Sequence, residues 1–156
     1  MKTLIIYDSY FGNTEKIATE IYKTFEKDTA KIINVEDFES ELLNDIDLLI
    51  VGSPTRAFRP TEAIVNIIKG TESLENIKVT SFDTRVDIEK VNSKILTFFV
   101  KMFGYADKPI LKLLVKKGGI PVHESMGFYV EDKEGPLTEG ELERARNWAK
   151  KIIKKA

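Results

Sequence analysis

The sequence predicts a single α/β domain in which helices cover both faces of a parallel sheet. Its 156 residues are the length of one domain. Short apolar runs alternate along the chain with longer segments of helical periodicity, which is the pattern of βαβ units. Residues 2–7 and 47–52 are almost continuously hydrophobic, as is typical of parallel strands buried on both faces.

The apolar runs predict five strands, and the third is apolar enough to be central. The expected ranges are 2–7, 31–35, 47–52, 77–82 and a broken fifth segment that follows Gly118 and Gly119 and continues to about residue 130.

Helical patterns fill the segments between the strands. The expected helices cover 14–27, Thr61 to Gly70, 87–103, 105–117 and a last segment opened by Thr138. Pro60 and Thr61 favour a helix start, and Gly70 favours an end. Thr138 and Glu141 form a capping box. The inward face of the last helix is expected to be Leu142, Ala145, Trp148, Ala149 and Ile152.

The composition excludes several classes of function. The chain has no cysteine, so it has no disulfide and no thiolate metal site. A single histidine, His123, argues against a histidine metal cluster or a Ser-His-Asp triad, and we expect it to pack rather than catalyse. A net charge of −1 gives no indication of nucleic-acid binding.

No segment approaches the roughly 20 apolar residues of a membrane span. The N-terminus also lacks the order of regions found in a signal peptide, so we expect a cytoplasmic protein. Residues 95–103 are more apolar than one helix face requires. Core packing is the favoured interpretation of this stretch, and a surface for a partner or a membrane is the alternative.

The turn between the first strand and the first helix predicts a site for a phosphate. It comprises Ser9, Tyr10, Phe11, Gly12, Asn13 and Thr14. Hydroxyls, a glycine and the unpaired amides of a helix N-terminus bind anions. The lysine of a triphosphate loop and the three glycines of a dinucleotide loop are both missing. With no positive side chain before Lys16, the turn suits a phosphomonoester held by hydrogen bonds. An ordinary capped turn is the alternative.

Two further loops are expected at the same edge of the sheet, because the carboxyl ends of parallel strands meet there. The loop after the third strand contains Pro54, Thr55, Arg56, Ala57 and Phe58, and the loop after the fourth contains Ser81, Phe82, Asp83, Thr84 and Arg85. Aromatic rings and guanidinium groups stack on flat heterocycles. Ordinary surface loops with salt bridges are the alternative for either loop alone.

These motifs resemble those of the flavodoxin family, over essentially the whole chain. Residues 9–14 match the family's phosphate loop except at Phe11, where the family usually has a hydroxyl. Residues 52–56 are similar to a loop of flavodoxin-like quinone reductases. Residues 127–137 look like the same stretch in a branch of flavodoxin-like proteins from anaerobic bacteria and archaea. The resemblance implies one flavodoxin-like domain over 1–156, a three-layer fold and a five-stranded parallel sheet in the order 2-1-3-4-5.

The resemblance also implies FMN as the cofactor. Residues 9–14 would enclose its phosphate, 54–58 would line one side of the isoalloxazine, and 81–85 would meet the other side or the pyrimidine edge. Arg56 aligns with a position where many flavodoxins have a stacking Trp, and no Tyr follows Asp83 closely. Phe58 and Phe82 could replace that aromatic sandwich only if their loops fold inward.

The function implied is an electron shuttle that uses FMN semiquinone and hydroquinone between redox protein partners, such as ferredoxin- or reductase-like proteins. A monomer or weak dimer is expected. An FMN-dependent NAD(P)H:quinone reductase is the alternative. A receiver domain is disfavoured, because Gly52 stands where it needs an aspartate. Arg56 or Arg85 near the ring would make the second reduction potential less negative, and a carbonyl flip is expected near Arg56–Ala57.

Overall fold

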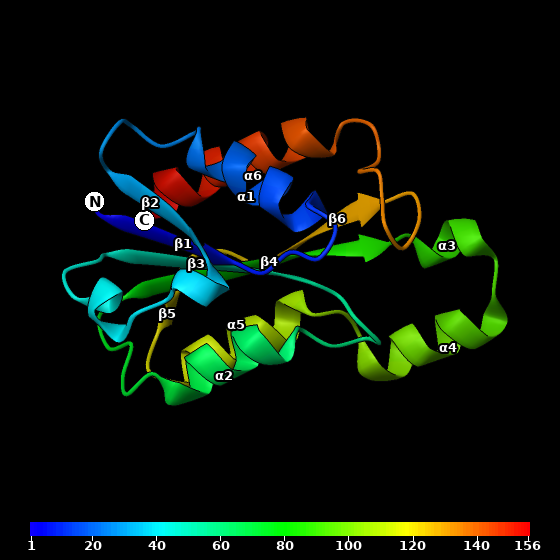
Figure 1. Ribbon diagram of the computed structural model, residues 1–156, viewed down its shortest axis with the longest axis horizontal. Helices are drawn as coiled ribbons and strands as arrows, with labels where there is room; N and C mark the ends of the chain where they lie inside the picture. Colours follow the sequence, from blue (N-terminus) through cyan, green and yellow to red (C-terminus); the bar gives the residue numbers. More distant parts are fainter.

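The computed structural model describes residues 1–156 and confirms the predicted three-layer α/β fold (Figure 1). The main path of the sheet runs in the order β2-β1-β3-β4-β5, and all pairings between strands are parallel. The strands are β1 Thr3–Tyr7, β2 Ala30–Asn34, β3 Leu48–Pro54, β4 Lys78–Val86, β5 Ile120–Pro121 and β6 Met126–Val130.

Helices α1 and α6 cover one face of the sheet, and α2 and α5 cover the other (Figure 1). The α-helices are α1 Asn13–Tyr22, α2 Glu62–Gly70, α3 Ile88–Val91, α4 Lys94–Phe103, α5 Asp107–Lys116 and α6 Glu141–Lys155. Two short 3₁₀ helices, Val35–Asp37 and Ser40–Leu43, precede β3. None of the helices has the length and apolar content needed to cross a membrane.

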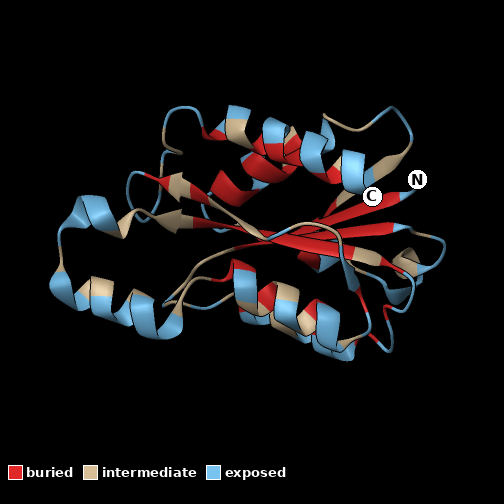
Figure 2. Cartoon of the chain, turned by 180° about the vertical axis from the view of Figure 1, so that it is seen from behind, coloured by how far each residue is buried: buried red, intermediate tan, exposed pale blue.

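The central strands are buried because both of their faces are covered (Figure 2). Successive side chains point to opposite faces, and the core therefore divides into two clusters. Leu4 and Val51 lie in the cluster beneath α2 and α5. Ile5, Ile50 and Trp148 lie in the cluster beneath α1 and α6.

The broken fifth strand is observed as two segments that share one edge of β4. β5 pairs with Lys78 and Val79, and β6 pairs with residues 82–86. β4 consequently runs beyond the predicted end at residue 82. Asp83, Thr84 and Arg85 thus belong to a strand and not to a loop, because β6 supplies backbone partners for them.

Two helices end differently from the prediction. α1 ends at Tyr22 instead of residue 27. Just after this end, the Thr24 hydroxyl donates to the Glu20 carbonyl. The stretch 87–103 divides into α3 and α4 at Asn92, whose φ is 50°. α4 contains no buried residue, so the core interpretation of residues 95–103 was wrong.

The predicted capping box is also wrong. α6 begins at Glu141 after Gly140, whose φ is 87°, and the Thr138 hydroxyl is buried without a partner. The Glu141 carboxylate instead accepts from the Tyr129 amide and from Arg144. Leu142 is 37% exposed and does not join the inward face, whereas the other four expected residues are buried.

Candidate functional site

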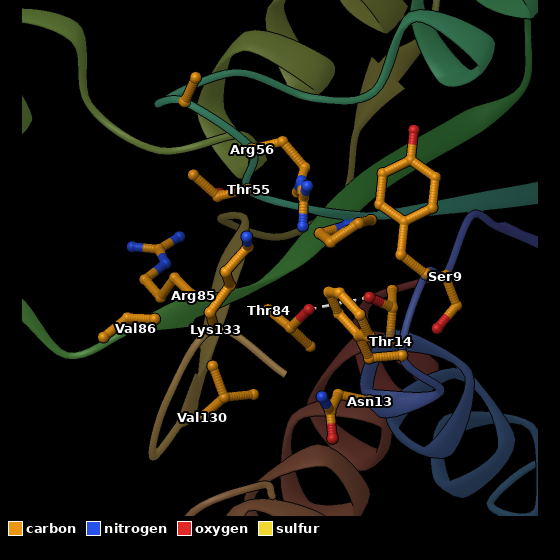
Figure 3. Close-up of a pocket in the computed structure, with 14 residues that line it drawn as sticks. Ser9, Asn13, Thr14, Thr55, Arg56, Thr84, Arg85, Val86, Val130 and Lys133 are labelled. Atoms are coloured by element: carbon orange, nitrogen blue, oxygen red, sulfur yellow. Dashed lines mark hydrogen bonds between the residues drawn. The ribbon is translucent and has the colours of Figure 1, made fainter. Parts of the chain in front are cut away.

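A cavity of about 540 Å³ lies at the carboxyl ends of β1, β3 and β4 (Figure 3). This position is the one that ligands occupy in open α/β sheets. Its lining residues are Ser9, Tyr10, Phe11, Asn13, Thr14, Pro54, Thr55, Arg56, Ala57, Thr84, Arg85, Val86, Val130 and Lys133. The three segments singled out in the sequence therefore converge on one cavity.

The turn before α1 forms one end of this cavity. Gly12 is the N-cap of α1 and has a φ of 81°, a conformation that glycine adopts at little cost. Gly12 does not line the cavity with a side chain, but its turn precedes the free amides of the helix N-terminus. The Thr14 hydroxyl lies 2.8 Å from the Thr84 hydroxyl, and the Ser9 hydroxyl accepts weakly from the Glu15 amide at 3.4 Å. Hydroxyls and amides thus gather where an anion would bind.

The segment after β3 closes into a tight hairpin. Arg56 and Arg59 exchange two backbone hydrogen bonds of 2.9 Å. Ala57 and Phe58 between them have φ values of 45° and 64°. Such left-handed values cost a residue with a side chain roughly 1–2 kcal/mol each. The hairpin holds the Arg56 guanidinium 5.0 Å from the centre of the Tyr10 ring and 5.7 Å from that of Phe11.

Neither Phe58 nor Phe82 lines the cavity, so neither supplies the aromatic sandwich considered above. The Phe58 ring turns outward and stacks on Phe99, with ring centres 5.8 Å apart. The Phe82 ring is fully buried over Gly52, at a distance that leaves no room for a Cβ on that glycine. The aromatic rings at the cavity are those of Tyr10 and Phe11, from the phosphate-loop segment.

The end of β4 carries a buried network of charges. The Arg85 Nε donates to Asp83 Oδ1 at 2.6 Å, and its Nη2 lies 2.7 Å from Asp107 Oδ1. Asp83 Oδ2 also accepts from the Thr55 hydroxyl at 2.6 Å. The Tyr105 ring lies 3.8 Å from the Arg85 guanidinium carbon. Arg85 therefore reaches the cavity with its charge already compensated.

Burial and the charges of neighbouring groups shift the pKa values of this network. It raises the pKa of Asp83 to about 6, although the neighbouring Arg85 opposes the shift. Burial disfavours the charged form of Arg85, but the two carboxylates outweigh burial and raise the pKa of Arg85. Burial also raises the pKa of Tyr105.

Two further predicted residues lie beside the cavity and not in it. Ser81 is fully buried and its hydroxyl donates to the Asp107 carbonyl at 2.7 Å. Asp83, on the same face of β4, is fully buried within the charge network. Their polar atoms are taken up by contacts with the start of α5 and with Arg85, and only Arg85, further along the same face of β4, reaches the cavity.

Sequence reasoning missed three lining residues: Val86, Val130 and Lys133. The turn at residues 9–14 has no positive side chain of its own before Lys16, but Lys133 brings one to the cavity from another part of the chain. Lys133 comes from the turn after β6, and its ammonium points into the cavity, as does the Arg56 guanidinium (Figure 3). The turn is fixed at the start of α1, where the Asn13 side chain donates to the Glu134 carbonyl at 3.0 Å. Two sequence signals pointed to this turn: the resemblance noted for residues 127–137, and Gly135, where a Cβ would meet the Asn13 side chain.

Comparison with known proteins agrees with this geometry. A family model described as a flavodoxin domain matches residues 4–116. No curated protein sequence matches the chain. Flavodoxin 1 from Bacillus cereus superposes with a TM-score of 0.78 at 17% identity, over 100% of this chain and 99% of its own. A Fusobacterium nucleatum flavodoxin bound to flavin mononucleotide superposes with a TM-score of 0.66 at 21% identity, over 99% and 98%.

The chain therefore belongs to the flavodoxin family, as the phosphate loop and its two companion segments indicated. This membership confirms FMN as the cofactor implied by the resemblance. The donor set fits such a ligand, with hydroxyls and amides at the start of α1 for a phosphate, and the Tyr10 and Phe11 rings with the Arg56 guanidinium for a flat ring.

Proposed function

We propose that this protein is a cytoplasmic, single-domain electron carrier that binds one FMN in the cavity at the carboxyl ends of β1, β3 and β4. The observation that carries the proposal is the convergence of three separate segments on one cavity of about 540 Å³. FMN supplies one- and two-electron chemistry when bound. The chain supplies the position, the exclusion of water and the surrounding charge.

The phosphate would lie at the N-terminus of α1, against residues 9–14. The buried pair of Thr14 and Thr84 fixes the floor of this end, because each hydroxyl is a partner for the other. Helix amides stabilise an anion without a paired cation. Lys133 would add a positive charge that is not committed to any carboxylate.

The ring would lie between the hairpin at Arg56–Arg59 and the end of β4. Arg56 is the free cation at this end, whereas Arg85 is compensated by Asp83 and Asp107. Two unit charges about 6 Å apart, at an effective dielectric of about 20, interact with an energy of roughly 3 kcal/mol before further screening. Arg56 would therefore favour the negatively charged, fully reduced flavin.

The partners of such a carrier would be redox proteins, such as ferredoxin- or reductase-like proteins. The chain has nearly equal numbers of basic and acidic residues, 24 against 25, so the overall charge would steer association only weakly. An FMN-dependent NAD(P)H:quinone reductase is the second candidate, favoured by the Pro54–Thr55–Arg56 segment that borders the cavity.

Visible spectra during anaerobic stepwise reduction test both candidates. An electron carrier should bind added FMN and accumulate the long-wavelength absorbance of a one-electron-reduced flavin. A reductase should instead bleach in one two-electron step when NADH or NADPH is added. A protein that does not bind FMN would contradict both.

A further inference from the structure

Helix α4 presents an unusual row of apolar side chains to solvent. None of its ten residues is buried (Figure 2). Spacings of three and four residues place five large side chains on one stripe. They are Ile95, Phe98, Phe99, Met102 and Phe103, which are 70%, 56%, 38%, 61% and 50% exposed. We call these five residues the α4 stripe.

Helix α4 lies beyond the carboxyl end of the sheet (Figure 1). α4 makes few contacts with the other helices and strands, and α3 is the element that it contacts most. Phe58 anchors the base of the stripe, with its ring centre 5.8 Å from that of Phe99 and 6.4 Å from that of Phe103. The outer part of the stripe, Ile95, Phe98 and Met102, is more than half exposed to solvent. An exposed apolar patch of this kind marks an interaction surface.

The segment that contains α4 is rich in lysine. Residues 88–117 contain seven lysines and only two acidic residues, a formal charge of +5, whereas the whole chain carries −1. One of the two acids, Asp107, is buried and paired with Arg85. A groove of about 880 Å³ continues from Phe58 and Phe103 between α2 and α5. Its charged lining is Arg59, Lys69, Lys112 and Lys116, against Glu62 alone.

We propose that α4 is an interfacial helix with which the protein docks on an anionic lipid surface. An apolar stripe rich in phenylalanine, flanked by lysines, is the pattern of helices that lie in the headgroup region of a bilayer. The stripe enters the acyl boundary, and Lys94 and Lys101 remain at the level of the anionic headgroups.

Lipid fits this surface better than a second copy of the chain. Two copies that met through their α4 stripes would bring the same lysines together, and like charges across an interface are unfavourable. A protein partner would need a preformed groove for five side chains that project from a free helix. A bilayer accepts such a convex ridge without a matching shape.

Co-sedimentation with vesicles tests the proposal. The FMN-loaded protein should sediment with vesicles of equal parts phosphatidylcholine and phosphatidylglycerol, and not with phosphatidylcholine alone. The double variant Ile95→Ser/Phe98→Ser should bind about tenfold or more weakly, because two large side chains no longer leave water. Its control is Ile120→Ser, since Ile120 is 51% exposed on β5, away from α4.

Charge is tested in the same assay. Lys94→Glu/Lys101→Glu should reduce binding by about tenfold or more, because each basic residue near an anionic surface contributes about a factor of five. Lys150→Glu/Lys151→Glu on α6 changes the net charge equally and should have a much smaller effect. FMN affinity should be unchanged in every variant, because none of these residues lines the FMN cavity.

Three outcomes would overturn the proposal. One is the absence of binding to the anionic vesicles at low salt. Another is binding that Ile95→Ser/Phe98→Ser leaves intact. The third is a dimer in sedimentation velocity that only the α4 variants abolish, which would show that a second copy covers the stripe. None of these outcomes bears on FMN binding, which is measured separately.

Discussion

The Arg85 guanidinium and the Asp83 carboxylate form a buried ion pair within one strand, two residues apart on the same face of β4. Asp107 holds the other side of the guanidinium. This arrangement distinguishes the two arginines of the site. Arg85 is compensated and structural, whereas Arg56 is uncompensated and rests on the aromatic rings of the first loop.

Replacement of Arg85 should affect the stability of the fold, whereas replacement of Arg56 should affect the reduction potential. Arg85→Ala leaves two buried carboxylates without their cation and should lower the free energy of unfolding by about 3–5 kcal/mol. Arg56→Ala should leave stability nearly unchanged and make the second reduction potential more negative by some tens of millivolts, a screened fraction of the roughly 3 kcal/mol given above. Urea denaturation and redox titration of both variants provide the measurements. A potential that shifts only in Arg85→Ala would reverse this assignment.

The raised pKa of Asp83 predicts a pH dependence of folding. Because the folded-state pKa of about 6 lies above the ordinary value near 4, the folded protein binds the extra proton. The resulting stabilisation is complete below about pH 4 and is lost as the pH rises through 6, by up to about 3 kcal/mol. Unfolding free energies from pH 4 to 7 should therefore decline more steeply in wild type than in Asp83→Asn. Parallel curves would show that Asp83 does not titrate in this window.

Lys133 should distinguish FMN from riboflavin. In Lys133→Gln the affinity for FMN should fall by about five- to tenfold, because the variant loses one charge-assisted contact that is partly open to solvent. Affinity for riboflavin, which lacks the phosphate, should stay the same. Fluorescence titrations at two salt concentrations measure both. Lys16→Gln is the matched control, because Lys16 lies in the first turn of α1 but does not line the cavity. An equal loss for both ligands would place Lys133 away from the phosphate.

Gly52→Ala should destabilise the fold. A Cβ at this position would overlap the buried Phe82 ring, whose neighbours Phe128 and Trp148 restrict its movement. The expected loss is about 1–3 kcal/mol. Gly70→Ala at the end of α2 meets nothing within 4 Å and should be neutral or slightly stabilising. Thermal unfolding of the two variants compares them directly, and a stable Gly52→Ala would mean that the ring can move aside.

Ala57→Gly should stabilise the hairpin that borders the cavity after β3. The φ of 45° at Ala57 costs about 1–2 kcal/mol, and glycine avoids this cost. The greater conformational freedom of glycine in the unfolded chain cancels part of the stabilisation. A net increase of about 0.5–1 kcal/mol is expected from chemical denaturation. Ala63→Gly, at an exposed position in α2, should instead lose a similar amount. If the expected carbonyl flip occurs here, the same variant should separate the two reduction potentials further.

The parallel sheet and the place of the site followed from local patterns in the sequence, whereas the strand order followed from the resemblance to flavodoxins. The apolar runs at residues 2–7 and 47–52 indicate strands buried on both faces. The hydroxyls, the glycine and the helix amides of the turn at 9–14 indicate an anion site. The end of β4 did not follow, because Asp83 and Arg85 resemble loop residues until their pairing with each other and with Asp107 is known. Lys133 was missed for a related reason: its turn reaches the cavity through contacts with Asn13, far away in sequence.

The division of the last sheet position between β5 and β6 has a consequence for solubility. An open edge strand with a long row of free amides and carbonyls invites pairing with another molecule. Here that edge consists of a two-residue segment ending in Pro121, which has no amide hydrogen, and a separate segment displaced along β4. No long uninterrupted row of backbone donors is left on this side, so this edge is a poor template for edge-to-edge aggregation.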